Sequence, residues 1–155
     1  SDIHSGSFWN KRAVMGGVDM LNNEKPDMIL FTGDLVNDRA TEMRDYGSVF
    51  EKLKAPMGVY SVLGNHDYGD YVHWSSAAAK QQNLKDLIDV QKNMGWRPLI
   101  DENVTFTEGG EKLALLGVQN WGAKGRFPKY GDLAKASIGA EDAAAKILLS
   151  HDPSH

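Results

Sequence analysis

The chain has 155 residues, 41% of them apolar and 25% charged, which predicts one ordinary globular domain with its own hydrophobic core. Its net charge of −4 and the absence of a Lys/Arg-rich run argue against nucleic acid or an anionic membrane surface as the main partner. Because the chain lacks cysteine, disulfides, thiolate zinc sites and cysteine nucleophiles are excluded, and His, Asp, Glu and Asn remain as possible metal ligands.

The start of the chain carries two polar side chains that could share one ion. We interpret Ser1-Asp2-Ile3-His4 as the end of a strand. On an extended backbone Asp2 and His4 point to the same side, so both could bind one metal ion. The Asp-x-His pattern is short and often arises by chance, which leaves a position without a metal role as the alternative. The chain also stops just after another apolar run, and we therefore expect a fragment of a longer protein.

A helix and a buried strand follow. Apolar residues on one helical face predict an amphipathic helix over Lys11–Asn23, with Asn10 as its N-cap. The continuous apolar run Met28–Phe31 is typical of a buried parallel strand, and it leads into Thr32-Gly33-Asp34. Asp34 is therefore a candidate metal ligand at a strand end. The alternative is that Asp34 caps the helix that follows.

The next predicted strand, Gly58–Val62, comes after a predicted helix over residues 40–54 and leads into Leu63-Gly64-Asn65-His66-Asp67. An amide, an imidazole and a carboxylate in a row could supply an oxygen ligand for a metal, a proton donor and the group that orients that donor. A surface turn is the alternative, because turns favour Gly, Asn and Asp. Strands joined by helices form parallel sheets, so the ends of these strands should meet at one edge.

The second half of the chain changes its pattern. Residues 68–79 are expected to form a loop beside the site, and Gln82–Met94 a helix that stops at Gly95. Alternating apolar residues then predict an antiparallel hairpin with a Gly-Gly turn, formed by residues 97–108 and 113–118.

The last segments contain a basic loop, a short helix and one more strand. The loop over residues 120–129 could contact an anionic substrate or could simply be solvated. Its basic residues are Lys124, Arg126 and Lys129. The Ala-rich stretch 137–145 suits a short helix, and the apolar run 147–149 predicts another buried strand. That strand would place His151 at its end, where the earlier strands also carry polar groups.

In chain order, the polar groups at the predicted strand ends are Asp2-x-His4, Gly33-Asp34, Gly64-Asn65-His66-Asp67 and His151. This ordered set resembles the signature of the calcineurin-like metallophosphoesterases over essentially the whole chain. The segment from Leu149 to Pro153 is similar to the bacterial branch of small phosphoesterases, which is related to membrane-associated members. The resemblance implies an α/β fold, namely a metallophosphoesterase-type β-sandwich of mixed sheets flanked by helices (αββα), incomplete at both ends.

The same resemblance implies a site with two divalent ions. Residue by residue, it assigns Asp2 and His4 to the first ion, Asn65 and His151 to the second, and Asp34 to both as a bridge. The expected ions are Mn, Fe, Zn or Mg, with Mn expected to support activity in vitro.

Two further residues receive catalytic roles from the resemblance. His66 would protonate the leaving oxygen or steady the phosphate, and Asp67 would fix its ring. The implied reaction is the hydrolysis of a phosphate mono- or diester by hydroxide that the two ions generate from water. The expected partner of the protein is thus a phosphoester substrate.

The sequence departs from the family pattern at two places. The family usually continues Gly-Asp-x-x-Asp, whereas Asn37 stands at the last position here and Asp38 follows it. The family's last motif, Gly-His-x-His, is absent, and His155 lacks the preceding glycine that the motif requires. We therefore expect residues 1–155 to be one metallophosphoesterase domain fragment that lacks the first strand and the part carrying Gly-His-x-His.

A second hypothesis is a binding module, because some members of the family keep the fold and serve as protein scaffolds without chemistry. Such members would be expected to have lost ligands, whereas the implied ligands of the first half are present here. No apolar stretch reaches the roughly 20 residues of a membrane span. The compartment is left unassigned, and the related membrane-associated members make the longer protein a candidate for membrane association.

Overall fold

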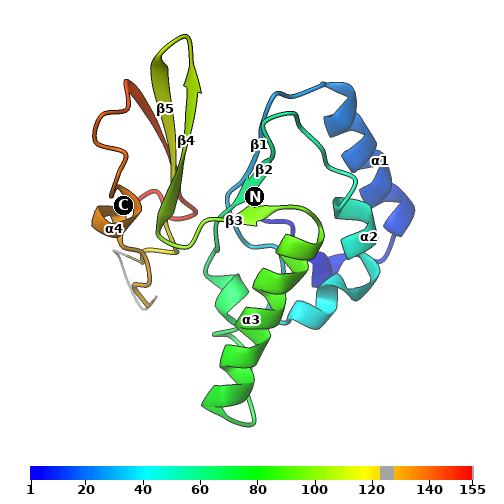
Figure 1. Cartoon of the computed structure of the whole chain (residues 1–155). Coiled ribbons are helices and arrows are strands. Elements are labelled where there is room, and N and C mark those ends of the chain that lie inside the picture. The colour runs from blue at the N-terminus through cyan, green and yellow to red at the C-terminus, as the bar shows by residue number, and fades with distance from the viewer. Residues whose placement is uncertain (123–127, 155) are drawn as a thin grey trace.

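The computed structural model describes residues 1–122 and 128–154, which form two three-stranded sheets packed against each other (Figure 1). The first sheet contains β1, β2 and β3, and the second contains β4, β5 and β6. The elements, with 3₁₀ helices labelled η, are η1 (Ser5–Ser7), α1 (Lys11–Asn23), β1 (Ile29–Phe31), η2 (Ala40–Asp45), α2 (Gly47–Phe50), β2 (Val59–Ser61), η3 (His66–Tyr68), α3 (Ala77–Asn93), β3 (Arg97–Pro98), β4 (Glu102–Glu108), β5 (Glu111–Gly117), α4 (Leu133–Ala136) and β6 (Ala145–Leu149).

The first sheet is parallel, as the alternation of strands and helices predicts. Strand β2 lies between β1 and β3, with Leu30 opposite Tyr60 in the β1–β2 register. The start of the chain runs beside the segment that follows β1: the N–H of Asp2 donates to the carbonyl of Gly33 (3.0 Å), and the N–H of His4 to that of Asp34 (3.1 Å). These backbone bonds bring the first residues of the chain to the carboxyl end of β1.

The helices agree with the sequence expectations in part. Helix α1 begins where it was predicted, and the side chain of Asn10 accepts the N–H groups of Arg12 and Ala13 as an N-cap. The prediction of a single helix over residues 40–54 is wrong, because the segment forms the 3₁₀ helix η2 followed by the short helix α2. The carboxylate of Glu42 turns back onto the N–H groups that precede η2. This contact pins the start of the segment in tight turns.

Helix α3 is longer than its apolar pattern indicated. It starts at Ala77, and the hydroxyl of Ser76 caps it by accepting the N–H of Ala79 (3.1 Å). The first residues of α3 are exposed, so they carry no apolar stripe from which the start could be predicted. None of the helices in the two described ranges is both long and apolar enough to cross a membrane.

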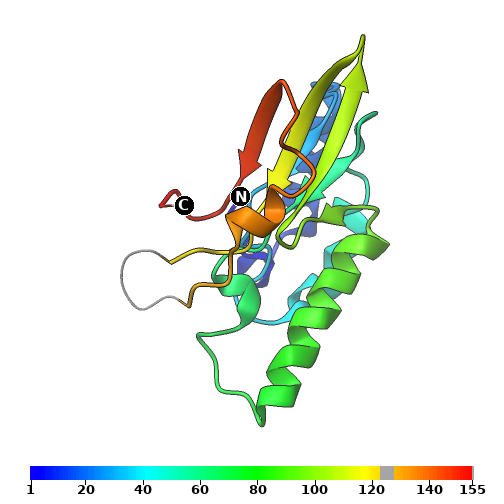
Figure 2. The ribbon, with the colours of Figure 1, turned by 60° about the vertical axis from the view of Figure 1, so that its left-hand side comes forward.

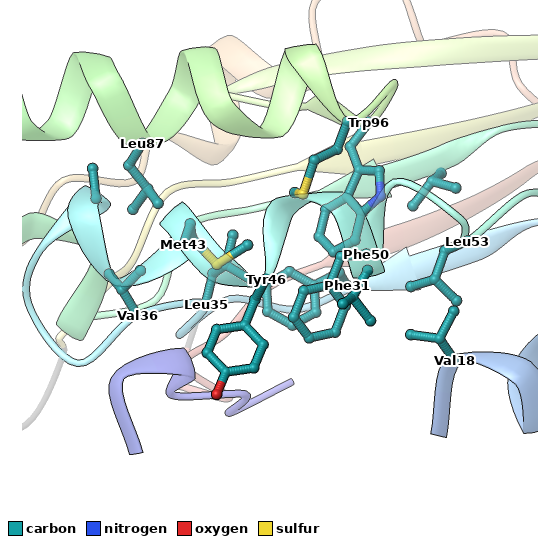
Figure 3. Packing of buried hydrophobic residues seen from close by; sticks show 14 residues of the cluster. Val18, Phe31, Leu35, Val36, Met43, Tyr46, Phe50, Leu53, Leu87 and Trp96 are labelled. Carbon is teal, nitrogen blue, oxygen red and sulfur yellow. The ribbon is translucent and has the colours of Figure 1, made fainter. Parts of the chain in front are cut away.

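The main core lies between the parallel sheet and its helices. Side chains from α1, α2, α3, β1 and β2 meet there, and Figure 3 shows Val18, Phe31, Phe50, Leu87 and Trp96 among them. The neighbouring residues of β2 point to opposite faces of the sheet. Val59 packs into this helical layer, whereas Tyr60 faces the second sheet.

The second sheet consists of the predicted hairpin and one added strand, but the first arm of the hairpin begins at Glu102 and not at residue 97, because Arg97–Pro98 pairs with β2 in the first sheet. Strands β4 and β5 are antiparallel, and their turn uses Gly109 and Gly110 at φ 58° and 87°, values that glycine adopts without strain. Strand β6 runs parallel to β5 at the edge of the sheet. Contrary to expectation it is not a buried strand, since Ile147 and Leu148 are exposed and only Leu149 of its residues is buried.

The helix expected over residues 137–145 is also displaced. The structure has α4 at Leu133–Ala136 instead, capped by the side chain of Asp132, and Gly139 at φ 81° lies in the turns that follow. These turns cover the outer face of the second sheet, where Ala140 packs on Ala114 and Leu116. Together with the helices on the first sheet they give the expected αββα order of layers.

The two sheets deliver opposite ends of the chain to one place. In Figure 2 the segment after β6 runs back toward the start of the chain. The ring of His151 reaches the carbonyl of Thr32 at the end of β1, with Nδ1 2.8 Å from the oxygen. The carboxyl ends of β1, β2 and β6 therefore share one edge, as the sequence predicts.

Candidate metal centre

Asp34 occupies the centre of this edge. The residue follows β1 in a left-handed conformation (φ 60°), and its side chain is buried, with 2% of the residue exposed. Its Oδ1 accepts the backbone N–H of His66 (2.9 Å). Asp34 does not cap a helix, since the next helical segment begins at Ala40. The alternative interpretation of this aspartate as an N-cap is therefore wrong.

Two imidazoles approach the other carboxylate oxygen of Asp34. The Nε2 atoms of His4 and His151 lie 3.6 Å and 3.4 Å from Oδ2. Burial acts to raise the pKa of Asp34, but the hydrogen bond from His151 and the backbone N–H of His66 outweigh it, and the pKa lies below its ordinary value. Asp34 is therefore an anion that accepts a hydrogen bond from His151 and has Nε2 of His4 close by.

Two groups of side chains around Asp34 could each hold a metal ion. The first comprises His4, Asp34 and His66, and the second Asp2, Asp34 and His151; within each group the possible ligand atoms all lie within 4.8 Å of one another. Asp34 belongs to both groups. Oxygen and imidazole donors suit borderline and hard divalent cations, and a shared carboxylate offsets the repulsion between two cations held close together.

Asn65 joins the second group through His151. Its Oδ1 lies 3.1 Å from Nε2 of His151, whose Nδ1 donates to the carbonyl of Thr32. A carbonyl can only accept, so this bond fixes the proton on Nδ1 and leaves Nε2 facing Asp34 and Asn65. The hydrogen bond to Asp34 raises the pKa of His151 to about 9, so Nε2 carries a proton between two oxygen acceptors at neutral pH. A divalent cation could take the place of that proton.

The ring of His66 lies at the same site, but its hydrogen-bond partner differs from the expected one. Its Nδ1 is 2.7 Å from the carbonyl oxygen of Asn37, so Nδ1 donates and Nε2 is left for other partners. The ring contacts His4 edge-on and packs against Tyr71, with ring centroids 4.6 Å and 4.4 Å away. The expectation that Asp67 fixes this ring is wrong, because the carbonyl of Asn37 does so.

Asp67 instead holds the two site loops together. Its carboxylate is completely buried and accepts backbone N–H groups, one from its own loop and the others from the loop after β1; the donors are Gly64, Asp34, Leu35 and Val36. Burial raises the pKa of Asp67 to about 6, with these N–H groups acting in the opposite direction. At neutral pH the side chain is therefore an anion enclosed by backbone donors.

The close approach of the two loops explains the glycines that precede the polar residues. A Cβ atom on Gly33 would collide with the backbone of Gly64, and a Cβ on Gly64 would collide with Asp34. Gly33 also adopts φ 97°, which disfavours any side chain. The glycines of the Gly-Asp and Gly-Asn-His-Asp patterns are thus needed to bring Asp34 and His66 together.

Some residues singled out in the sequence lie away from the centre or outside the described ranges. Lys124, Arg126 and His155 lie outside the described residues, whereas Lys129 stacks over the ring of Trp121 at 4.8 Å. Asn37 contributes its backbone carbonyl to the site, while its side chain bonds to Ser7. Sequence patterns do not signal backbone contacts of this kind.

Comparison with known proteins agrees with the geometry. The family model for calcineurin-like phosphoesterases matches residues 1–155, the whole chain. The chain is 33% identical to the uncharacterized metallophosphoesterase YkuE of Bacillus subtilis and 30% identical to a transmembrane protein with metallophosphoesterase domain of Bos taurus. Each alignment covers 99% of this chain, but 49% and 34% of the respective relative.

A further relative, an uncharacterized metallophosphoesterase of Aquifex aeolicus, is 27% identical and has 53% of its length covered. The chain thus spans about a third to a half of the curated relatives named here. Some relatives are transmembrane proteins by name, whereas the described residues of this chain include no membrane-spanning helix. With a family model that matches over its full length and the polar groups at its strand ends brought together around Asp34, this chain belongs to the calcineurin-like phosphoesterase family.

Proposed function

We propose that the protein containing this chain hydrolyses a phosphate mono- or diester with the help of two divalent cations. The observation that carries this proposal is that Asp34 belongs to both groups of possible ligands, one with His4 and one with His151. A helix cap or a surface turn would not require two imidazoles beside one buried carboxylate. Membership of a phosphoesterase family supports the choice of substrate class.

In this proposal His4 holds the first cation, Asn65 and His151 hold the second, and Asp34 holds both. Asp2 was expected to bind the first cation with His4, but it lies in the ligand group of Asp34 and His151 and could serve the second cation as well. Bound cations of this kind activate a water molecule as the nucleophile and stabilise the charge that builds up on the attacked phosphate. The donor set of oxygen and imidazole nitrogen suits Mn, Fe, Zn or Mg, and Mn is the ion we expect to support activity in assays.

The contacts of His151 support its role as a ligand. Nδ1 donates to Thr32, which orients the ring and leaves Nε2 directed at Asp34 and Asn65. Metal-bound histidines usually donate their second ring nitrogen to a carbonyl or carboxylate in this way. The raised pKa of His151 shows that this position favours positive charge.

His66 is the proposed proton donor. Its Nδ1 keeps its proton on the carbonyl of Asn37, so in the doubly protonated ring Nε2 is the atom that would give a proton to the leaving oxygen of the substrate and then stay behind as an acceptor. His66 also lies in one of the possible ligand groups, with His4 and Asp34. Because a proton donor and a ligand differ in what their removal does to the bound metal, a His66→Ala variant distinguishes them.

The proposal is tested on the full-length protein with an aryl phosphomonoester and an aryl phosphodiester. We expect turnover of at least one of them, loss of that turnover on complete chelation, and recovery when Mn²⁺ is added back. Elemental analysis of the active protein should give two cations per chain. Undiminished turnover after complete chelation would overturn the proposal, as would the failure of every added divalent ion to produce activity.

A further inference from the structure

We propose that Tyr71 is a positioning residue of the metal centre, with its hydroxyl group fixing the amide of Asn65 and its ring fixing the imidazole of His66. The inference rests on the function proposed above, because it takes Asn65 as a ligand and His66 as the proton donor. Tyr71 lies in the loop between η3 and α3 and is about half exposed. Nothing in the sequence pattern distinguishes it from the other aromatic residues of that loop.

The hydroxyl contact holds the NH₂ end of the Asn65 amide while its oxygen faces the site. Nδ2 of Asn65 donates to the Tyr71 hydroxyl (2.7 Å), while Oδ1 is directed at His151. The two ends of an amide have the same shape, but only the oxygen has lone pairs that a cation can use. A hydroxyl can accept from the NH₂ end or donate to the oxygen, but Nε2 of His151 already faces Oδ1, so here the Tyr71 hydroxyl accepts from Nδ2. The two contacts together hold Asn65 in the orientation in which it can be a ligand.

The ring contact limits the movement of His66. The imidazole contacts two other rings, His4 edge-on at 4.6 Å and Tyr71 at 4.4 Å with an interplanar angle of 36°. The hydrogen bond from Nδ1 to Asn37 sets the rotation of the imidazole, and the ring of Tyr71 packs against it. A proton donor needs a fixed distance to the leaving group, since small displacements of catalytic groups are costly.

The loop that carries Tyr71 is fixed on both sides of this residue. Before it, Asp70 pairs with Lys80. After it, the indole N–H of Trp74 donates to the carbonyl of Gly69 (2.7 Å). These contacts hold the segment in place, so Tyr71 reaches the site from a supported backbone.

The carboxyl side of the loop has a further support. The guanidinium of Arg39 stacks over Trp74 at 4.4 Å. Gly69 adopts φ 66°, and a Cβ there would lie 2.8 Å from the Trp74 ring and 2.9 Å from the carbonyl of Asp38. The turn at Gly69 thus places the loop directly beside the residues that follow Asp34.

The first experiment measures Mn²⁺ binding to the metal-free full-length protein by calorimetry. Tyr71→Phe keeps the ring and removes the hydroxyl, so we expect one of the two ions to bind roughly tenfold more weakly, the usual effect of losing a partner of a ligand. Tyr130→Phe is the matched control. It removes a hydroxyl bonded to Asp70 (3.3 Å) in the same region without touching a proposed ligand, and it should leave both affinities unchanged.

A second variant separates the ring from the hydroxyl. Tyr71→Leu loses both, and we expect a further fall of about tenfold in kcat relative to Tyr71→Phe at saturating Mn²⁺. The effect on affinity should depend on residue 65. In an Asn65→Asp background both ends of the side chain are oxygens, so Tyr71→Phe should lose most of its effect on Mn²⁺ binding.

The outcomes separate the two proposals. A wild-type protein that binds no pair of ions would overturn the proposed function. A wild type with two ions and equal Mn²⁺ affinities in Tyr71→Phe and Tyr130→Phe would overturn the role of Tyr71 alone. An undiminished effect of Tyr71→Phe in the Asn65→Asp background would likewise show that the hydroxyl does not act by orienting the amide.

Discussion

The loop after β1 and the loop after β2 each carry a buried aspartate, and these two carboxylates have different partners. Asp67 is fully buried and accepts N–H groups on both oxygens, two on Oδ1 and two on Oδ2. Asp34 is nearly as buried, yet it accepts one backbone N–H on Oδ1 and presents Oδ2 to the imidazoles of His4 and His151. The two carboxylates are therefore similarly buried, but only Asp34 has an oxygen that is free of backbone N–H groups of the described residues.

The difference indicates what each carboxylate can do. The lone pairs of Asp67 are used by the backbone, so this side chain serves to join the loops. Asp34 keeps lone pairs directed at other donors, which is what a ligand requires. The two functions depend on each other, because Asp67 binds the N–H of Asp34 while Asp34 binds the N–H of His66.

The largest expected effect comes from Asp34→Asn. The change removes the charge shared by both groups of possible ligands, so we expect turnover to fall by at least about 10³-fold and both ions to be lost or weakened. His4→Ala and His151→Ala should each weaken mainly one ion. Elemental analysis and a phosphoesterase assay on the full-length protein measure both effects. An Asp34→Asn protein with two ions and a near-normal rate would remove the basis for the two-metal proposal.

His66→Ala is expected to have the next largest effect. Loss of one general acid should lower kcat by roughly 10²–10⁴-fold while the metal content stays the same. His73, an exposed histidine of the following loop, provides the matched control, because His73→Ala should change neither quantity. A missing metal ion in His66→Ala would show that His66 is a ligand, as its place beside His4 and Asp34 also allows.

The sequence was sufficient to predict which residues meet, because that depends on strand order. The apolar runs before Asp34 and Asn65 predict parallel strands, and parallel strands in one sheet end at the same edge. His151 also lies at the predicted edge. Its strand, β6, belongs to the other sheet and is more exposed than its apolar run indicated. An apolar run cannot tell an edge strand from a central one.

The sequence was not sufficient to predict how the individual side chains are used. Asp67 follows His66 directly, which made it the natural partner of that ring, but it points into the backbone of the loop after β1. The actual partner, the carbonyl of Asn37, has no side-chain signature. Tyr71 likewise acts through a fold of the loop at Gly69 that only the three-dimensional structure reveals.

Asp67→Asn makes the same chemical change as Asp34→Asn and tests whether Asp67 serves to join the two loops. Asparagine replaces one oxygen by an NH₂ group, so two of the buried N–H groups would face a donor instead of an acceptor. We expect the free energy of unfolding at pH 7 to fall by about 2–4 kcal/mol, measured by urea denaturation of the metal-free protein. Asp34→Asn loses the charged pair with His151, so its cost should be present at pH 7 and largely gone above pH 9, whereas the cost of Asp67→Asn should persist there. The same pH dependence of the loss in both variants would contradict the division of roles.

The smallest expected effect is a pH dependence that comes from the neighbour of Asp34. The hydrogen bond to Asp34 raises the pKa of His151 from an ordinary 6.5 to about 9. In the metal-free protein this pairing stabilises the fold fully below about pH 6.5, and the stabilisation is lost as the pH rises through 9. The affinity for metal should change with pH in the opposite direction and increase as the pH rises, because a cation must displace the proton from Nε2.

Displacement of the one proton on His151 should therefore make the Mn²⁺ affinity increase by about tenfold for each pH unit between 6.5 and 8.5. Calorimetry in two buffers of different ionisation enthalpy counts the protons released on binding. His151→Gln cannot hold that proton, so its binding should release one proton fewer and depend less steeply on pH. If wild type and His151→Gln released the same number of protons, His151 would not be a ligand, and Asp34 would be shared by fewer partners than the comparison with Asp67 requires.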